Sequence, residues 1–173
     1  LQGDWSSDVC SSDLTANSIP GGSNVTLTGE WTRYSFVGTS TGTSGTLNIS
    51  TYGGVTARNI YVWGAQVEQS STAGEYVKTT STINSAPRFD HKVTRTTTNQ
   101  LTYSEEFDQW NAVNSSVTVD SSVAIAPDGS VTADKVVENT ATSTHYVGQV
   151  GTFVSGATYT YSVYAKEIGR AHV

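Results

Sequence analysis

The sequence predicts an all-β protein, a sandwich or a barrel, on three observations. Threonine and aromatic residues, which favour the pleated and half-buried surface of a sheet, are abundant, with 27 Thr, 9 Tyr, 4 Phe and 4 Trp in 173 residues. Leu, Lys and Glu, which fill exposed helical positions, are scarce. Short alternating runs are separated by glycine-containing turns at intervals of roughly 8 to 12 residues, as is typical of sandwiches and barrels. The aromatic content argues against a disordered or glycosylated stalk.

Alternation of polar and apolar residues predicts the strands of the first half of the chain. These strands are residues 24–28, 31–37, 46–51 and 58–68. The side chains expected to point inward from the second of them are Tyr34 and Phe36, and in the third Leu47 and Ile49 share one side. The run 58–68 is apolar on both faces, as a central or a corner strand requires. Gly64 in its middle predicts a bulge or a close approach of another part of the chain.

The second half begins after a segment with little alternation, residues 80–100, which reads as a linker. Residues 104–110 predict a single helical turn with Ser104 as its N-cap. Ala126-Pro127-Asp128-Gly129 predicts a turn, because proline presets one dihedral angle and glycine accepts a positive one. The predicted strands of this half are residues 117–119, 131–138, 144–150 and 157–166. In the last of them the residues that share one face are Tyr159, Tyr161, Val163 and Ala165.

The two ends of the chain encode the same DNA read in opposite directions. One back-translation of residues 167–173, GAG ATC GGA AGA GCA CAC GTC, has the reverse complement GAC GTG TGC TCT TCC GAT CTC, which encodes residues 8–14. The string resembles a common sequencing adapter, whose continuation would encode residues 4–7. We therefore expect residues 1–14 and 167–173 to be adapter-derived, and the rest to be an interior stretch of a longer polypeptide.

Removing these ends changes the composition. Their charged residues are Arg170, Asp4, Asp8, Asp13 and Glu167. Without them 8 of the 9 basic and 11 of the 15 acidic residues remain, so the net charge is −3 instead of −6. This small and scattered charge predicts neither nucleic acid nor a membrane surface as a partner. No apolar run approaches the roughly 18 residues of a membrane-spanning helix. Cys10, the single cysteine, lies in an adapter segment, so we expect no disulfide.

No arrangement of residues in the sequence points to catalysis. A nucleophile needs a nearby base, and the two histidines of the interior stretch, His91 in the linker and His145 in a strand, have no G-x-S-x-G or comparable elbow beside them. Glu105 and Glu106 are adjacent and cannot face each other across a sugar, so we interpret them as a solvated helix start. Asp90 beside His91 is an ordinary neighbouring pair. The sequence predicts a non-enzymatic protein without catalytic residues.

Aromatic rings are the candidate sugar contacts, because pyranose C–H groups pack on ring faces while hydroxyl groups bond to nearby polar side chains. The available rings are Trp31, Tyr61, Trp63, Trp110, Tyr146 and Tyr164. Spacing favours an inward position for Trp63 and Trp110. Tyr61, Tyr146 and Tyr164 are expected to reach solvent and are the predicted glycan contacts.

Longer motifs then point to a family. They are NIYVWGAQVEQSSTAGEYVKTT at 59–80, LTYSEEFDQW at 101–110, APDGSVTADKVVE at 126–138 and SGATYTYSVYAK at 155–166. Residues 99–166 resemble the first half of a jelly-roll module common in bacteriophage tail, tail-fibre and spike proteins and akin to carbohydrate-binding modules. Residues 31–80 resemble its second half. APRFDH at 86–91 is similar to the segment that joins consecutive modules, although the usual GLLIE-like stretch is absent.

The resemblance implies the domain organisation. Residues 15–80 would be the C-terminal half of one β-sandwich module, residues 81–100 a linker, and residues 101–166 the N-terminal half of the next module. Each half alone would expose unpaired strand edges and half a core. We therefore expect the halves to pair into one permuted jelly-roll sandwich, in which residues 159–165 pack against residues 34–36 or 60–63.

The resemblance also implies a function. It is that of a structural and glycan-contacting module of a phage tail fibre or spike in host attachment, located in the virion. Its partners would be a cell-surface glycan and other virion proteins, and the parent protein would be a homotrimer. The alternative is an accessory carbohydrate-binding module of a secreted, extracellular bacterial glycoside hydrolase or adhesin.

Jelly-roll modules often bind a structural calcium through carboxylates. Asp120, Asp128 and Asp134 are the candidate ligands here because they lie in one stretch. No D-x-D-x-D-G loop orders them, and the turn at residues 126–129 already accounts for Asp128. We predict neither a metal site nor a cofactor.

Overall fold

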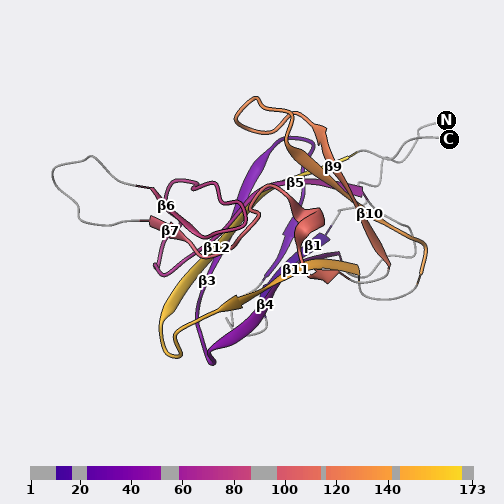
Figure 1. Ribbon diagram of the computed structural model, residues 1–173. Coiled ribbons are helices and arrows are strands. Elements are labelled where there is room, and N and C mark those ends of the chain that lie inside the picture. Colours follow the sequence, from indigo (N-terminus) through magenta and orange to yellow (C-terminus); the bar gives the residue numbers. More distant parts are fainter. Residues whose placement is uncertain are drawn as a thin grey trace, which may run out of the picture.

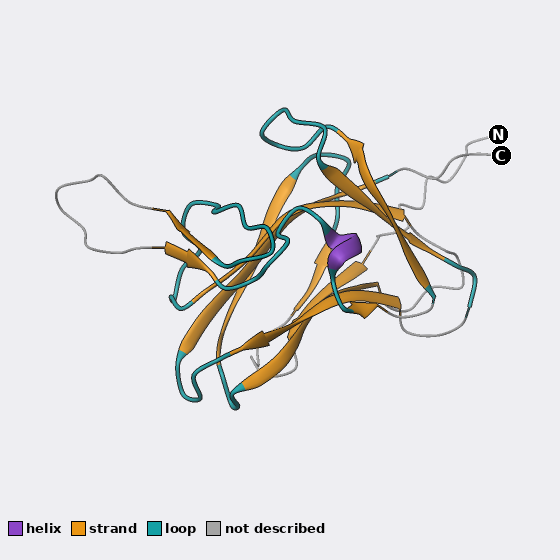
Figure 2. Cartoon of the chain, in the orientation of Figure 1, coloured by secondary structure: helices purple, strands orange, loops and turns teal. Residues whose placement is uncertain are grey.

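A computed structural model of the chain describes residues 11–16, 23–51, 59–86, 97–113, 116–141 and 145–168, and these form an all-β sandwich (Figures 1 and 2). The strands of the first half are β1 (Ser11–Ala16), β2 (Ser23–Thr26), β3 (Thr32–Thr39), β4 (Ser44–Thr51) and β5 (Asn59–Glu68). A short pair follows, β6 (Asn84–Ala86) and β7 (Thr97–Asn99). The elements of the second half are the 3-10 turn η1 (Phe107–Gln109), β8 (Ala112–Val113), β9 (Val117–Ala124), β10 (Ala133–Glu138), β11 (His145–Thr152) and β12 (Thr158–Glu167).

The long strands form two antiparallel sheets. Sheet A has the order β2-β1-β4-β11-β8, and sheet B has the order β3-β12-β5-β10-β9. Strand β1 includes residues 11–14, part of the segment that we expect to be adapter-derived. The pairing of these residues with β2 and β4 is evidence neither for nor against an adapter origin.

Strands from the two halves of the chain are interleaved in both sheets. In sheet B, β12 of the second half lies between β3 and β5 of the first, so that Tyr161 is opposite Phe36 on one side and Val67 on the other. Strand β12 also places Val163 opposite Tyr34. In sheet A, β11 pairs with β4 along its whole length. The predicted packing of residues 159–165 against the first half is therefore confirmed, and the two halves form one sandwich.

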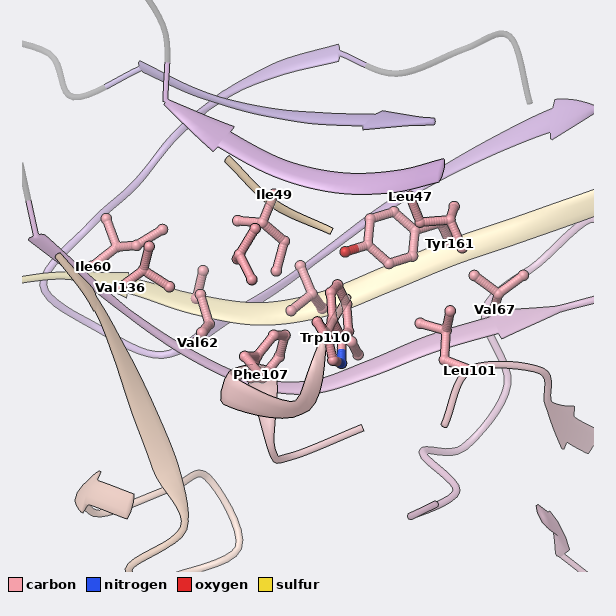
Figure 3. Packing of buried hydrophobic residues seen from close by; sticks show 14 of the residues in the cluster. Leu47, Ile49, Ile60, Val62, Val67, Leu101, Phe107, Trp110, Val136 and Tyr161 are labelled. Atoms are coloured by element: carbon pink, nitrogen blue, oxygen red, sulfur yellow. The ribbon is translucent and has the colours of Figure 1, made fainter. Parts of the chain in front are cut away.

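Apolar side chains from both sheets meet between them (Figure 3). The predicted inward face of β3 is confirmed, since Phe36 is buried and the half-buried Tyr34 packs against the core. Leu47 and Ile49, which were predicted to share one side of β4, are both buried, and Tyr161 and Val163 of β12 are fully so. Phe36 packs edge-on against Tyr161, with ring centroids 5.3 Å apart. Burial of each such side chain contributes about 1.5–3 kcal/mol, so this layer provides most of the stabilisation of the fold.

The segment before and through η1 closes one side of the core (Figure 2). Phe107 and Trp110 stack with ring centroids 4.7 Å apart, and both are buried among residues of the two sheets. The indole Nε1 of Trp110 donates a hydrogen bond to the Tyr103 carbonyl at 3.0 Å. The core position predicted for Trp110 is confirmed.

The predicted helical turn exists, but the prediction that Ser104 is its N-cap is wrong. The N-cap position is Glu106, which makes no side-chain cap hydrogen bond. The hydroxyl of Ser104 is buried and already bonded, because it accepts from the Thr79 amide at 2.8 Å and pairs with the Tyr76 hydroxyl at 2.6 Å. The amide of Phe107 donates instead to the Asp134 carboxylate at 2.8 Å.

Part of the segment predicted to be a linker forms the separate two-stranded sheet β6-β7, and its end bonds to β5 of sheet B. Strand β10 pairs with β5 only as far as Val62. Beyond that point the fully buried side chain of Asn99 makes hydrogen bonds to the backbone of β5. Its side-chain oxygen accepts from the amides of Val67 and Leu101, both at 3.1 Å. Its amide nitrogen donates to the carbonyls of Ala65 at 2.9 Å and Val77 at 3.0 Å. The backbone of β5 is thereby satisfied where β10 ends.

Candidate functional site

The outer face of sheet B, the side turned away from sheet A, carries four of the six aromatic rings that the sequence offers as candidates for sugar contact, two of them predicted contacts. We use the term outer aromatic face for Trp31, Tyr61, Trp63 and Tyr164. Alternation along β5 and β12 places Tyr61, Trp63 and Tyr164 on this side because the residues between them point into the core, and Trp31, directly before β3, packs against the same cluster. Trp31, Tyr61 and Tyr164 are half-buried, whereas Trp63 is only 4% exposed.

Trp63 anchors a second, smaller apolar cluster on this face. Its ring lies 4.6 Å from that of Tyr76 and 5.5 Å from that of Tyr164, and its Nε1 donates to the Thr132 hydroxyl at 3.0 Å. Trp63 is buried, but the predicted inward position is wrong, because the ring lies in this second cluster on the outer face and not in the main core. The next residue, Gly64, has no side chain and so leaves room for the rings of Tyr76 and Tyr164.

Gly64 has a positive φ of 63°, and the pairing of β5 with β12 shifts register at this point. A β-bulge of this kind inserts one extra residue, so Val62 before it and Ala65 after it both reach the core. A Cβ at Gly64 would lie 3.3 Å from ring atoms of Tyr164 and Tyr76. Both features predicted for this glycine, a bulge and a close approach, are confirmed.

A transverse row of alternating aromatic and cationic side chains crosses the outer face. On the register of sheet B, Lys166 is opposite Tyr61, Tyr61 is opposite Lys135, and Lys135 is opposite Asp120. The Lys166 Nζ lies 5.1 Å from the ring centroid of Trp31 and 5.4 Å from that of Tyr61, within the range of cation–π attraction. We call Trp31, Lys166, Tyr61 and Lys135 the lysine–aromatic row.

The loop after β5 covers the other end of the outer face, where the Thr160 hydroxyl donates to the Ser70 carbonyl at 2.9 Å and the Tyr76 ring packs against that of Trp63. Arg33 fixes this loop, because its guanidinium donates to the Gly74 carbonyl at 2.6 Å and to the Ser162 hydroxyl at 2.9 Å. Beneath the loop the carboxylate of Glu68 accepts from the Gly74 amide at 2.6 Å and from the Gln66 side chain at 3.0 Å. Arg33 and Glu68 are thus occupied by structural bonds, and the lysine–aromatic row lies outside the covered end.

Glu105 is buried, so the prediction that it belongs to a solvated helix start is wrong. It is 4% exposed, pairs with Lys78 at 2.7 Å and accepts from the Tyr76 hydroxyl at 3.1 Å. Burial, with a further contribution from the charge of Glu105, raises the pKa of Tyr76 above its usual range. Glu106 is exposed, as predicted.

The three aspartates named as calcium candidates have separate partners. Asp134 is fully buried and accepts from the amides of Phe107 and Ser122, both at 2.8 Å. Asp120 pairs with Lys135 at 3.1 Å, and Asp128 accepts from the Ser130 amide at 2.9 Å within its own turn. No three His, Cys, Asp or Glu side chains are grouped as metal ligands within the part of the chain that the structure describes.

The electrostatic environments of two of these aspartates differ. Burial raises the pKa of Asp134 from 3.8 to about 6, and the bonds from Ser122 and Phe107 oppose this rise. Hydrogen bonds from Ser130 lower the pKa of Asp128. The predicted turn around Asp128 is confirmed, because the Gly129 amide donates to the Ala126 carbonyl at 3.0 Å and Gly129 has a φ of 86°.

The structure brings two of the three predicted glycan contacts together. Tyr61 and Tyr164 share the outer aromatic face, whereas Tyr146 is on β11, opposite Ser50 in the other sheet. His145 is buried at the beginning of β11 with its Nδ1 3.9 Å from the Glu138 carboxylate. His91 and Asp90 lie outside the described residues.

Sequence reasoning did not identify Lys166 or Trp31 as members of one surface. Alternation places Trp31 on the same face of its strand as Arg33, and Lys166 on the same face of its strand as Tyr164, but it does not relate the two strands to each other. The order of the strands was the missing signal, because only the position of β12 between β3 and β5 makes these one face.

No family model, no curated protein and no solved structure matches the chain. Across the described residues, no helix is both long and apolar enough to cross a bilayer.

Proposed function

We propose that the chain is a non-enzymatic β-sandwich module that contacts a glycan through the outer aromatic face of sheet B, as part of a phage tail-fibre or spike protein in host attachment. The observation that carries this proposal is the placement of three half-buried rings, those of Trp31, Tyr61 and Tyr164, on one face of one sheet. Ring faces of this kind suit the C–H surface of a pyranose.

Polar groups beside these rings provide hydrogen bonds for sugar hydroxyls. Lys166 and Lys135 donate only, and Asp120 at the end of the row accepts. All of them lie on strands, and residues on strands are positioned more firmly than residues on loops. The motif resemblance to phage fibre and spike modules agrees with such a surface and supplies the biological setting of the proposal.

A glycan array probed with the full chain tests the proposal. We expect wild type to bind a defined set of glycans and Trp31→Ala or Tyr61→Ala to weaken that binding about tenfold, which is roughly 1.4 kcal/mol per ring. Tyr146→Ala is the matched control, because it removes a half-buried tyrosine from the opposite sheet.

The results of the array distinguish glycan contact on sheet B from contact on sheet A and from no contact. Wild type that binds no glycan would contradict glycan contact, and loss of binding in Tyr146→Ala with retention in Trp31→Ala would place the contact on sheet A. A glycoside hydrolase domain in the same reading frame of the parent gene, instead of virion genes beside it, would favour the accessory carbohydrate-binding module.

A further inference from the structure

We propose that the lysine–aromatic row selects saccharides that carry a carboxylate, with Lys166 as the counter-ion. This inference rests on the proposed function and specifies the ligand class of the same face. It comes from the way in which the lysines of the described chain are paired.

Of the three lysines that the structure describes, two have a carboxylate partner. Lys78 pairs with Glu105 at 2.7 Å and Lys135 with Asp120 at 3.1 Å. Lys166 has no carboxylate within 4.0 Å among the described residues, and its ammonium group lies between the rings of Trp31 and Tyr61. The row therefore contains one neutralised cation and one that is not neutralised.

The two rings hold the ammonium group of Lys166 in place without cancelling its charge. A ring face attracts a cation through its quadrupole, and it also displaces part of the water around that cation. A carboxylate on a sugar that stacks on Trp31 or Tyr61 would come within reach of the same ammonium group. It would accept a charge-assisted hydrogen bond from that group, and the attraction between the two opposite charges would add to what a neutral hydroxyl in the same place could provide.

Charge at the other end of the row limits the ligand to isolated carboxylates. Asp120 neutralises Lys135 and would repel a second negative group there, and the net charge is negative, −6 for the whole chain and −3 without the two ends that we expect to be adapter-derived. A saccharide with one carboxylate beside Lys166 and neutral hydroxyl groups toward Asp120 fits this polarity. A densely charged polyanion does not.

Matched glycan pairs test this inference with the full chain. Each pair is a uronic-acid-containing oligosaccharide and its methyl ester, which keeps the shape of the sugar and removes the charge. We expect wild type to prefer the acid about tenfold at low salt, and the preference to shrink as salt is raised. Lys166→Gln should bind both members equally, while Lys166→Arg and Lys135→Gln should keep the preference.

The outcomes separate this inference from the proposed function. Wild type that binds methyl esters or other neutral glycans as tightly as the acids would overturn the inference alone. Retention of the full preference in Lys166→Gln would also overturn it. Binding of no glycan at all would overturn both proposals, and a thermal unfolding curve for each variant ensures that lost binding is not lost folding.

Discussion

The two faces of sheet B are built from the same strands but differ in what covers them. On the inner face Val62 and Tyr161 are fully buried against sheet A and the η1 segment. On the outer face Tyr61 and Tyr164, their near neighbours in sequence, stay half-buried. One alternating strand can therefore provide stability on one side and a binding surface on the other, because successive side chains point to opposite faces.

Both faces depend on the position of β12 inside sheet B. Strand β12 comes from the second half of the chain and lies between β3 and β5 from the first half. Without it the inner face would lose Tyr161, and the outer face would lose Lys166 from the middle of its row. The following predictions test the two faces in turn.

The largest effect is expected on the inner side, at Trp110. Trp110→Ala removes a side chain that is 2% exposed and its contact with Phe107, and the Tyr103 carbonyl loses one of its two donors while it keeps the bond from the Glu106 amide at 3.2 Å. We expect the free energy of unfolding, measured with urea, to fall by about 3–5 kcal/mol.

Trp31→Ala is the matched change on the outer face. It loses a half-buried ring and one hydrogen bond, from Nε1 to the Ile125 carbonyl at 3.0 Å, so we expect a loss of about 1 kcal/mol. Equal losses at Trp110 and Trp31 would refute the distinction between the faces.

Asp134 makes the stability of the inner side dependent on pH. Its folded-state pKa of about 6 lies above the ordinary 3.8, so its contribution to folding is fully present below pH 3.8 and is lost as the pH rises through 6. We expect the unfolding free energy of wild type, relative to that of Asp134→Asn, to fall by roughly 1–3 kcal/mol between pH 4 and pH 7. Urea titrations of both proteins at several pH values measure this difference, and parallel pH profiles would contradict it.

The smallest effects distinguish two tyrosines on the inner face of β12. The hydroxyl of Tyr161 is fully buried and has no hydrogen-bond partner among the described residues, whereas that of Tyr159 accepts from the Val154 amide at 2.9 Å. We expect Tyr161→Phe to raise the unfolding free energy by about 1 kcal/mol and Tyr159→Phe to lower it by a similar amount. Changes of the same sign in the two variants would show that one of these environments is wrongly assigned.

Much of this fold could be predicted from the sequence, because alternation reports directly which side chains share a face. The sets of residues that share a face around Leu47 and Tyr161, the burial of β5 on both faces and the bulge at Gly64 all follow from local patterns. Motif resemblance added the pairing of the two halves, which no local pattern contains.

The errors concern residues whose environment is set by distant parts of the chain. Ser104 looked like an N-cap and Glu105 like a solvated residue because their partners, Thr79, Tyr76 and Lys78, lie about 25 residues away in sequence. Asn99 looked like part of a linker for the same reason. The site was predictable only in part, because alternation identifies Tyr61 and Tyr164 but the row around Lys166 requires the strand order of sheet B.

Both proposals and both faces require β12 to lie between β3 and β5, and nuclear Overhauser contacts between backbone protons test this most directly. We expect contacts from Tyr161 to Phe36 on one side and to Val67 on the other, since these residues are paired across the sheet. Contacts from β12 confined to residues 101–166 would contradict the account.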